Sequence, residues 1–201
     1  MENDRLNVYR KLVLEKVPLI LSLEDREELS PTFGCFDRTY WQWKFTDFPG
    51  ARFQEALLLL SYVYSVKFDG NIYHGNKKIL KWIEAGYVFW SNMQHGDGSF
   101  DEAYPYERSF VATGFGLFYL TEAYFLIKDS IAGDTRDTIL SAFGKTGDWL
   151  IKNDEQHAFI SNHRLGASAG LFNLSQILSE KKYEERCWTL WKSVKQNQSS
   201  D

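Results

Sequence analysis

Residues 110–127 read FVATGFGLFYLTEAYFLI, and this stretch decides the fold class. It is apolar around nearly its whole circumference at helical spacing, whereas a helix on the surface of a domain keeps a polar face. Residues 56–66 and 165–178 have the same character, and stretches with a clear polar face lie between these runs. The alternation indicates helical hairpins, each with an inner and an outer member. The sequence therefore predicts an all-α protein.

The inner helices are spaced regularly along the chain. They begin near residues 52, 109 and 161, which gives a repeat of about 50 to 57 residues, as long hairpins would. The inner runs are rich in small residues, which let helices approach closely around a crowded axis. We expect residues 1–201 to form a single helical domain, an α/α toroid with about seven helices in an incomplete ring.

Composition and charge exclude several classes of protein. With 201 residues, 44% of them hydrophobic, the chain can bury one sizeable core. A net charge of −4 gives no electrostatic footprint for nucleic acid. Cys35 and Cys187 lie far apart and in no metal-like spacing, so we expect a reduced, cytoplasmic protein without metal or cofactor. No signal peptide is expected, and no uninterrupted apolar run reaches the roughly 18 residues of a membrane span.

Three segments crowded with acidic, aromatic and amide side chains run directly into the inner helices. We call residues 37–49 the first loop, residues 94–108 the second loop and residues 154–164 the third loop. If the inner helices are parallel, the three loops meet at one end of the molecule. The sequence therefore predicts a functional site at that end.

The last residues repeat part of the second loop. Residues 198–201 copy the Gln-x-x-Asp pattern of residues 94–97. Six hairpins at this period would need about 330 residues. We therefore expect the sequence to be the amino-terminal part of a longer toroid. An open ring leaves the flanks of its last inner helix uncovered, which favours self-association.

Motifs in the three loops resemble one known family. The motifs are Phe36-Asp37-Arg38, Trp41-x-Trp43-Lys44-x-x-Asp47-Phe48-Pro49, Gly98-Ser99-Phe100-Asp101, Pro105-x-Glu107 and His157-Ala158-Phe159-Ile160-Ser161-Asn162-His163. Over about residues 37–201 the chain resembles the amino-terminal toroid of heparinase II/III-like proteins, a group often associated with bacterial surface polysaccharides. The resemblance implies further helices and a β-sandwich outside this sequence, so we expect this segment alone to be inactive.

The resemblance also implies catalytic residues. Toroid-type polysaccharide lyases commonly place an Asn-His pair at the start of an inner helix, a pattern that Asn162 and His163 match. β-Elimination from a uronate requires a base for the C5 proton and donors that neutralise the adjacent carboxylate. His163 suits the base, and Asn162 at a positive helix N-terminus suits the donor. Tyr40 or Tyr104 is the candidate acid for the leaving oxygen, and the sequence does not choose between them.

The other candidates would bind an acidic polysaccharide or oligosaccharide. They are Asp37, Arg38, Trp41, Trp43, Asp101, Glu107, Arg108 and Arg164. Each has a structural alternative: the tryptophans stack on sugar rings or pack in the core, and the carboxylates contact sugar or form a solvated acidic loop. For the Asn-His pair, the alternative is that it only begins a helix and bonds a neighbouring loop.

Two classes of function follow from these residues. The first is a carbohydrate-active enzyme, either a lyase or a hydrolase that uses two of Asp37, Asp101, Glu102 and Glu107 as acid and base. The second is a noncatalytic scaffold or glycan-binding module. A terpenoid cyclase or prenyltransferase is a third interpretation, suggested by the turn at residues 94–98, but no aspartate-rich diphosphate motif supports it.

Overall fold

The computed structural model describes residues 2–198, and all regular structure in that range is helical. The helices are α1 (Glu2–Leu23), α2 (Arg38–Trp41), the 3₁₀ helix η1 (Ala51–Ala56), α3 (Leu57–Ser65), α4 (Lys77–Met93), α5 (Phe110–Ile127), α6 (Gly133–Lys152), α7 (Ser161–Leu178) and α8 (Lys181–Gln196). The predicted all-α class is confirmed. The short α2 and η1 were not predicted. Of the Gln-x-x-Asp copy at the chain end, residues 199–201 lie outside the described range.

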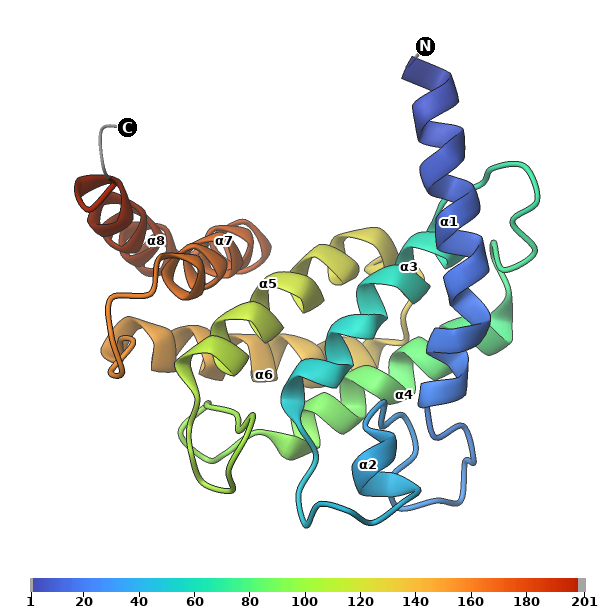
Figure 1. The fold of residues 1–201 in the computed structure, drawn as a ribbon, viewed down its shortest axis with the longest axis horizontal. Helices are drawn as coiled ribbons and strands as arrows, with labels where there is room; N and C mark the ends of the chain where they lie inside the picture. The colour runs from blue at the N-terminus through green and yellow to red at the C-terminus, as the bar shows by residue number, and fades with distance from the viewer. Residues whose placement is uncertain (1, 199–201) are drawn as a thin grey trace.

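The inner helices α3, α5 and α7 lie in a row, with the outer helices α4 and α6 along one side (Figure 1). Helix α5 packs between α3 and α7, while α4 and α6 pack on each other and α6 also touches α5, α7 and α8. Helices α1 and α8 lie at opposite ends of the row (Figure 1). This is the predicted alternation of inner and outer helices, and closure of such hairpins into a toroid stays a prediction.

Small residues let α5 and α7 approach each other closely, as the sequence predicts. A Cβ on Gly114 would lie 2.8 Å from the Cβ of Ala167, and one on Gly170 would lie 2.8 Å from the backbone nitrogen of Phe118. Both distances are shorter than real contacts allow. Larger side chains at these glycines would therefore push the two inner helices apart.

Helix α5 corrects one expectation. Its 18 residues are long and apolar enough, by length and composition, to cross a membrane. However, 61% of that segment is buried inside the protein. Ser109 caps its start by accepting a hydrogen bond from the N–H of Ala112 at 3.2 Å. Its apolar circumference is thus explained by neighbours on several sides, as for the central helix of a core.

The core also anchors the second loop. Phe100 is fully buried and stacks on Trp90 with ring centroids 4.4 Å apart, and Phe143 of α6 meets the same indole edge-on at 5.7 Å. Gln94 donates to the carbonyl of Ala142 at 2.9 Å. These contacts fix both ends of the second loop's turn against α4 and α6, so the residues between them are held in place.

Helix α1 continues through Pro18 and ends at Leu23, where the indole of Trp41 donates to the Leu23 carbonyl at 2.8 Å. Cys35 and Cys187 are both buried free thiols, as expected. Burial raises the pKa of Cys35 to about 12, so this thiol is unreactive at neutral pH.

Candidate functional site

The three loops lie at the same end of the inner helices, as predicted (Figure 1). The first and second loops share a hollow of about 380 Å³, to which Asp47 and Tyr106 contribute. The second and third loops share a larger cleft of about 880 Å³, to which Arg108 and His163 contribute. The second loop therefore separates two neighbouring hollows on one end of the molecule.

Asp37 holds the first loop together. Its side chain is buried, with 2% of the residue exposed. Oδ1 accepts hydrogen bonds from the backbone N–H groups of Thr39 at 3.0 Å and Tyr40 at 3.3 Å, and Oδ2 accepts from Gly50 at 2.9 Å. Asp37 thus caps α2 and ties the start of the loop to its end. Its contact with a polysaccharide stays a prediction.

The other predicted residues of the first loop divide into exposed and packed side chains. Trp43 is 50% exposed, and the guanidinium of Arg38 lies 5.1 Å from its ring centroid. Trp41 is partly buried, and its indole N–H donates a hydrogen bond to the carbonyl of Leu23 at the end of α1. Tyr40 is also partly buried. Trp43 is therefore the exposed member of this group, whereas Arg38, Tyr40 and Trp41 are partly buried.

The carboxylates of the second loop bind its own backbone. Asp101 accepts from the N–H groups of Tyr106 at 2.7 Å and Arg108 at 2.9 Å, and both donors have positive φ, 64° and 54°. Oε2 of Glu107 accepts from three N–H groups, those of residues 102–104. These bonds hold non-glycine residues in the left-handed region, which is unfavourable without such support.

The larger cleft lies between the second loop, the C-terminal half of α6 and the third loop. Its titratable lining is Asp97, Glu107, Arg108, Lys145, Asp148, Lys152, Asp154, Glu155, His157 and His163. Neither of the predicted acids Tyr40 and Tyr104 lines this cleft, and Tyr104 is 70% exposed on the second loop. The structure therefore brings His163 together with Glu107 and Arg108, but not with the tyrosines.

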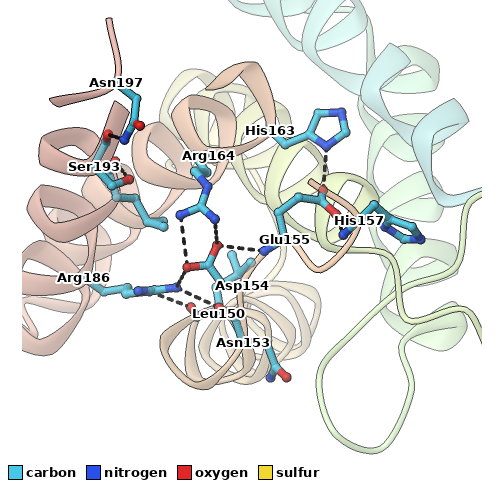
Figure 2. Close-up of polar contacts among 11 residues, drawn as sticks. Leu150, Asn153, Asp154, Glu155, His157, His163, Arg164, Arg186, Ser193 and Asn197 are labelled. Atoms are coloured by element: carbon cyan, nitrogen blue, oxygen red, sulfur yellow. Dashed lines mark hydrogen bonds and ion pairs between the residues drawn. The ribbon is translucent and has the colours of Figure 1, made fainter. Parts of the chain in front are cut away.

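Two arginines fix the start of the third loop (Figure 2). Arg164 meets Asp154 with both terminal nitrogens, at 3.0 and 3.2 Å, and Arg186 approaches the same carboxylate at 3.4 Å. Arg186 also donates to the carbonyls of Leu150 at 3.0 Å and Asn153 at 2.8 Å. Arginines from α7 and α8 thus hold the C-terminal end of α6 in place. The Arg164 guanidinium is occupied by its ion pair with Asp154.

Glu155, the next residue, connects these ion pairs to the predicted catalytic histidine. Its side chain is only 3% exposed, and Oε2 lies 2.6 Å from Nδ1 of His163 while Oε1 lies 3.0 Å from Nδ1 of His157 (Figure 2). Burial raises the pKa of Glu155, but the hydrogen bonds from His163 and His157 outweigh it and lower the pKa to about 2. Glu155 is therefore ionised at neutral pH and accepts hydrogen bonds from both rings.

The ring of His163 is held at a helix start that carries no side-chain cap. Ile160 precedes α7 and offers no capping oxygen, so the first N–H groups of the helix have no side-chain acceptor. The His163 ring meets Phe115 of α5 edge-on, with centroids 6.4 Å apart. Asn162, beside it, is exposed. The Asn-His pair thus stands at the positive end of an inner helix, as the sequence predicts.

Sequence reasoning missed several residues of the cleft. Glu155 was not singled out, although it lies between Asp154 and the histidines in a loop that was. Lys145 and Lys152 of α6 also line the cleft. Their spacing of seven residues places both on one helical face, but only the fold shows that this face borders the two loops. No motif signals Arg186, which comes from α8.

Metal chemistry finds no support in the described part of the chain. Within residues 2–198, no group of three or more His, Cys, Asp or Glu side chains is arranged to hold a metal ion. The acids of the cleft instead bind basic side chains or backbone amides.

Comparisons with known proteins give one match. A family model described as the Ulvan lyase N-terminal domain matches residues 46–201, which include the second and third loops and the cleft between them. No curated protein and no solved structure matches. The match confirms the predicted relation to polysaccharide lyases at the level of that class. The finer resemblance to heparinase II/III-like proteins stays a prediction.

Proposed function

The chain belongs to the Ulvan lyase N-terminal domain family, and on this premise we propose that its larger cleft binds a uronate-containing polysaccharide for β-elimination. In this proposal, His163 is the base and the Asn162 amide donates a hydrogen bond to the uronate carboxylate. The observation that carries it is the bond between Glu155 and His163 at the cleft.

The hydrogen bond between Glu155 and His163 determines which ring nitrogen of His163 can accept the substrate proton. An ionised Glu155 can only accept a hydrogen bond, so Nδ1 of His163 carries a proton and donates it. In the neutral imidazole, the lone pair then lies on Nε2, which points away from Glu155 (Figure 2). A carboxylate that fixes the tautomer and orientation of a histidine is a recurrent support for a general base.

In the elimination, the proton on C5 is removed and the bond from C4 to the leaving oxygen is broken. Nε2 takes the C5 proton, the electron pair forms the C4–C5 double bond, and the C4–O bond breaks with protonation of the leaving oxygen. Charge that builds on the uronate carboxylate is stabilised by the Asn162 amide and by the uncapped N-terminus of α7. Neither predicted acid, Tyr40 or Tyr104, lines this cleft, so in this proposal the leaving oxygen takes its proton from water.

Hydrolysis is less well supported by the same geometry. A hydrolase needs two carboxyl groups that reach the sugar, and the candidates Asp37, Asp101 and Glu107 already accept hydrogen bonds from two or three backbone N–H groups each. Glu102 is paired with Arg52 at 3.3 Å. Of these four, only Glu107 lines the larger cleft, so a pair of carboxylates for hydrolysis is not brought together there.

The test is the His163→Ala variant of the natural protein that carries this sequence. Formation of unsaturated uronate ends, measured by ultraviolet absorbance, should fall by about 10²- to 10⁴-fold because the base is lost. His157→Ala is the matched control. His157 binds the other oxygen of Glu155 but is 81% exposed, so its loss should leave most of the activity.

Other outcomes would replace the proposal. Reducing ends without unsaturated products, abolished by Glu107→Gln, would establish hydrolysis instead. Binding of the polysaccharide without either product would establish a noncatalytic glycan-binding module.

A further inference from the structure

We propose that one face of α8 is a docking surface for a second copy of this chain, and that the two α8 helices meet there in antiparallel directions around a twofold axis. The face is the one that carries Glu184, Trp188, Trp191 and Lys195. The proposal concerns assembly and does not depend on the chemistry of the cleft.

Three large aromatic side chains gather where α7 and α8 end the row of helices (Figure 1). Trp188 and Trp191 of α8 and Phe172 of α7 are 43%, 39% and 40% exposed. The ring centroids of Phe172 and Trp188 lie 6.4 Å apart, and those of Trp188 and Trp191 lie 5.8 Å apart. Indole rings are highly buried on average, so a contiguous exposed cluster of this kind marks an interaction surface.

The geometry of the aromatic cluster favours a protein partner over a sugar chain. The planes of the two ring pairs are inclined by 70° and 86°, so each ring turns its edge to the next. A sugar chain stacks on flat ring faces that are turned the same way. Perpendicular rings form an uneven surface with which the side chains of another protein can interdigitate. Tryptophan is also enriched among the residues that contribute most to protein interfaces.

A charge of each sign flanks the two indoles along α8. Glu184 lies four residues before Trp188, and Lys195 lies four residues after Trp191, so all four side chains share one face of the helix. Glu184 accepts a hydrogen bond from the indole of Trp188 at 3.4 Å, and the ammonium of Lys195 lies 5.2 Å from the ring centroid of Trp191. The acid is therefore at one end of the indole pair and the base at the other.

This order of charges makes the face complementary to itself. When two α8 helices meet in antiparallel directions with Trp188 of one copy opposite Trp191 of the other, Glu184 of each copy faces Lys195 of the other copy. Helices that meet in parallel directions would instead place like charges opposite each other. Charges that flank the apolar strip of a helical interface set its orientation in this way. The same patch is used on both copies, so the contact closes as a dimer.

Sedimentation equilibrium of the chain over a range of concentrations tests the surface. The parent chain should dimerise, and Trp191→Ala should raise the dissociation constant by about 30-fold or more, as for a central interface residue that occurs twice in a symmetric dimer. Tyr9→Ala is the matched control. Tyr9 is an exposed aromatic residue of α1, at the opposite end of the row, so its loss should leave dimerisation unchanged. Circular dichroism checks that each variant keeps its helices.

Charge reversal tests the antiparallel arrangement while both indoles stay in place. Glu184→Lys and Lys195→Glu should each weaken self-association by about tenfold, because either substitution places like charges opposite each other at two points of the dimer. A mixture of the two variants should form a heterodimer with the affinity of the parent chain, since every facing pair then has opposite charges again.

Other results would overturn the proposal. A parent chain that stays monomeric at millimolar concentration would show that the aromatic cluster does not bind a second copy. Loss of the dimer in Tyr9→Ala but not in Trp191→Ala would place the contact on α1. A mixture of the two charge variants that stays monomeric would exclude the antiparallel arrangement. Binding of a neutral oligosaccharide that Trp191→Ala abolishes, with no dimer in the parent chain, would make the cluster a sugar-binding surface instead.

Discussion

The first and third loops each bury one carboxylate, but they surround it with different donors. Asp37 is 2% exposed and accepts hydrogen bonds from the backbone of its own loop. The Glu155 side chain is 3% exposed and accepts hydrogen bonds from two imidazoles at the cleft. Both loops precede an inner helix, and both were predicted to contribute to the site.

The difference lies in what each acid holds in place. Backbone and hydroxyl donors keep their protons at neutral pH, so the bonds to Asp37 fix the conformation of the first loop. Imidazoles are titratable, so the bonds to Glu155 orient two titratable rings at the cleft. Equal burial therefore does not mean equal surroundings, and the identity of the donors separates the two cases.

The largest effect on stability is expected for Asp37→Ala. The substitution leaves three buried or partly buried N–H groups without their acceptor and removes the cap of α2, so it should lower the free energy of unfolding by about 2 to 4 kcal/mol. Urea denaturation measures this. Asp37→Asn keeps one acceptor oxygen and should cost about half as much. A loss below about 1 kcal/mol for the alanine variant would mean that the first loop does not depend on its acid.

A smaller, pH-dependent effect is expected for Glu155→Gln. The folded protein holds the pKa of Glu155 at about 2, below its ordinary 4.5, so ionised Glu155 favours the folded state. This contribution is complete above pH about 4.5 and is lost as the pH falls toward about 2. The variant should be less stable by about 1 to 2 kcal/mol at pH 6, a value discounted for solvent screening, and the difference should shrink on acidification.

The measurement is urea denaturation of both proteins at several pH values between 6 and about 3. Glu28→Gln, at an exposed carboxylate paired with Lys81, is the control and should change stability by less than about 0.5 kcal/mol at pH 6. A difference for Glu155→Gln that grows on acidification would contradict the assigned direction of the pKa shift.

Local sequence patterns predict only part of this fold and of its candidate site. Helix α5 and the shared end of the loops could be predicted, because an apolar circumference and a hairpin period are local patterns. Helix α2 could not, since four residues are helical there only because Asp37 caps them and the loop closes at Gly50. His163 was found through its neighbour Asn162, whereas its partner Glu155 required knowledge of how the third loop folds back.

The smallest effect on stability is expected at Trp43, and it sharpens the contrast between the loops. Trp43 is half exposed and lies against Arg38 and Phe45, so Trp43→Ala should change the free energy of unfolding by less than about 0.5 kcal/mol. Trp41→Ala, which removes a partly buried ring and its bond to Leu23, should cost more. Trp43 and Phe45 are exposed aromatic rings of the first loop, and we expect a polysaccharide that reaches this loop to stack on them. Affinity for a long polymer should then fall by about threefold in Trp43→Ala, as for one exposed cation–π or stacking contact, while affinity for a tetrasaccharide confined to the cleft stays the same.

Unchanged affinity for both ligands would make the first loop purely a structural element. Equal loss for both would place Trp43 inside the cleft that the third loop forms.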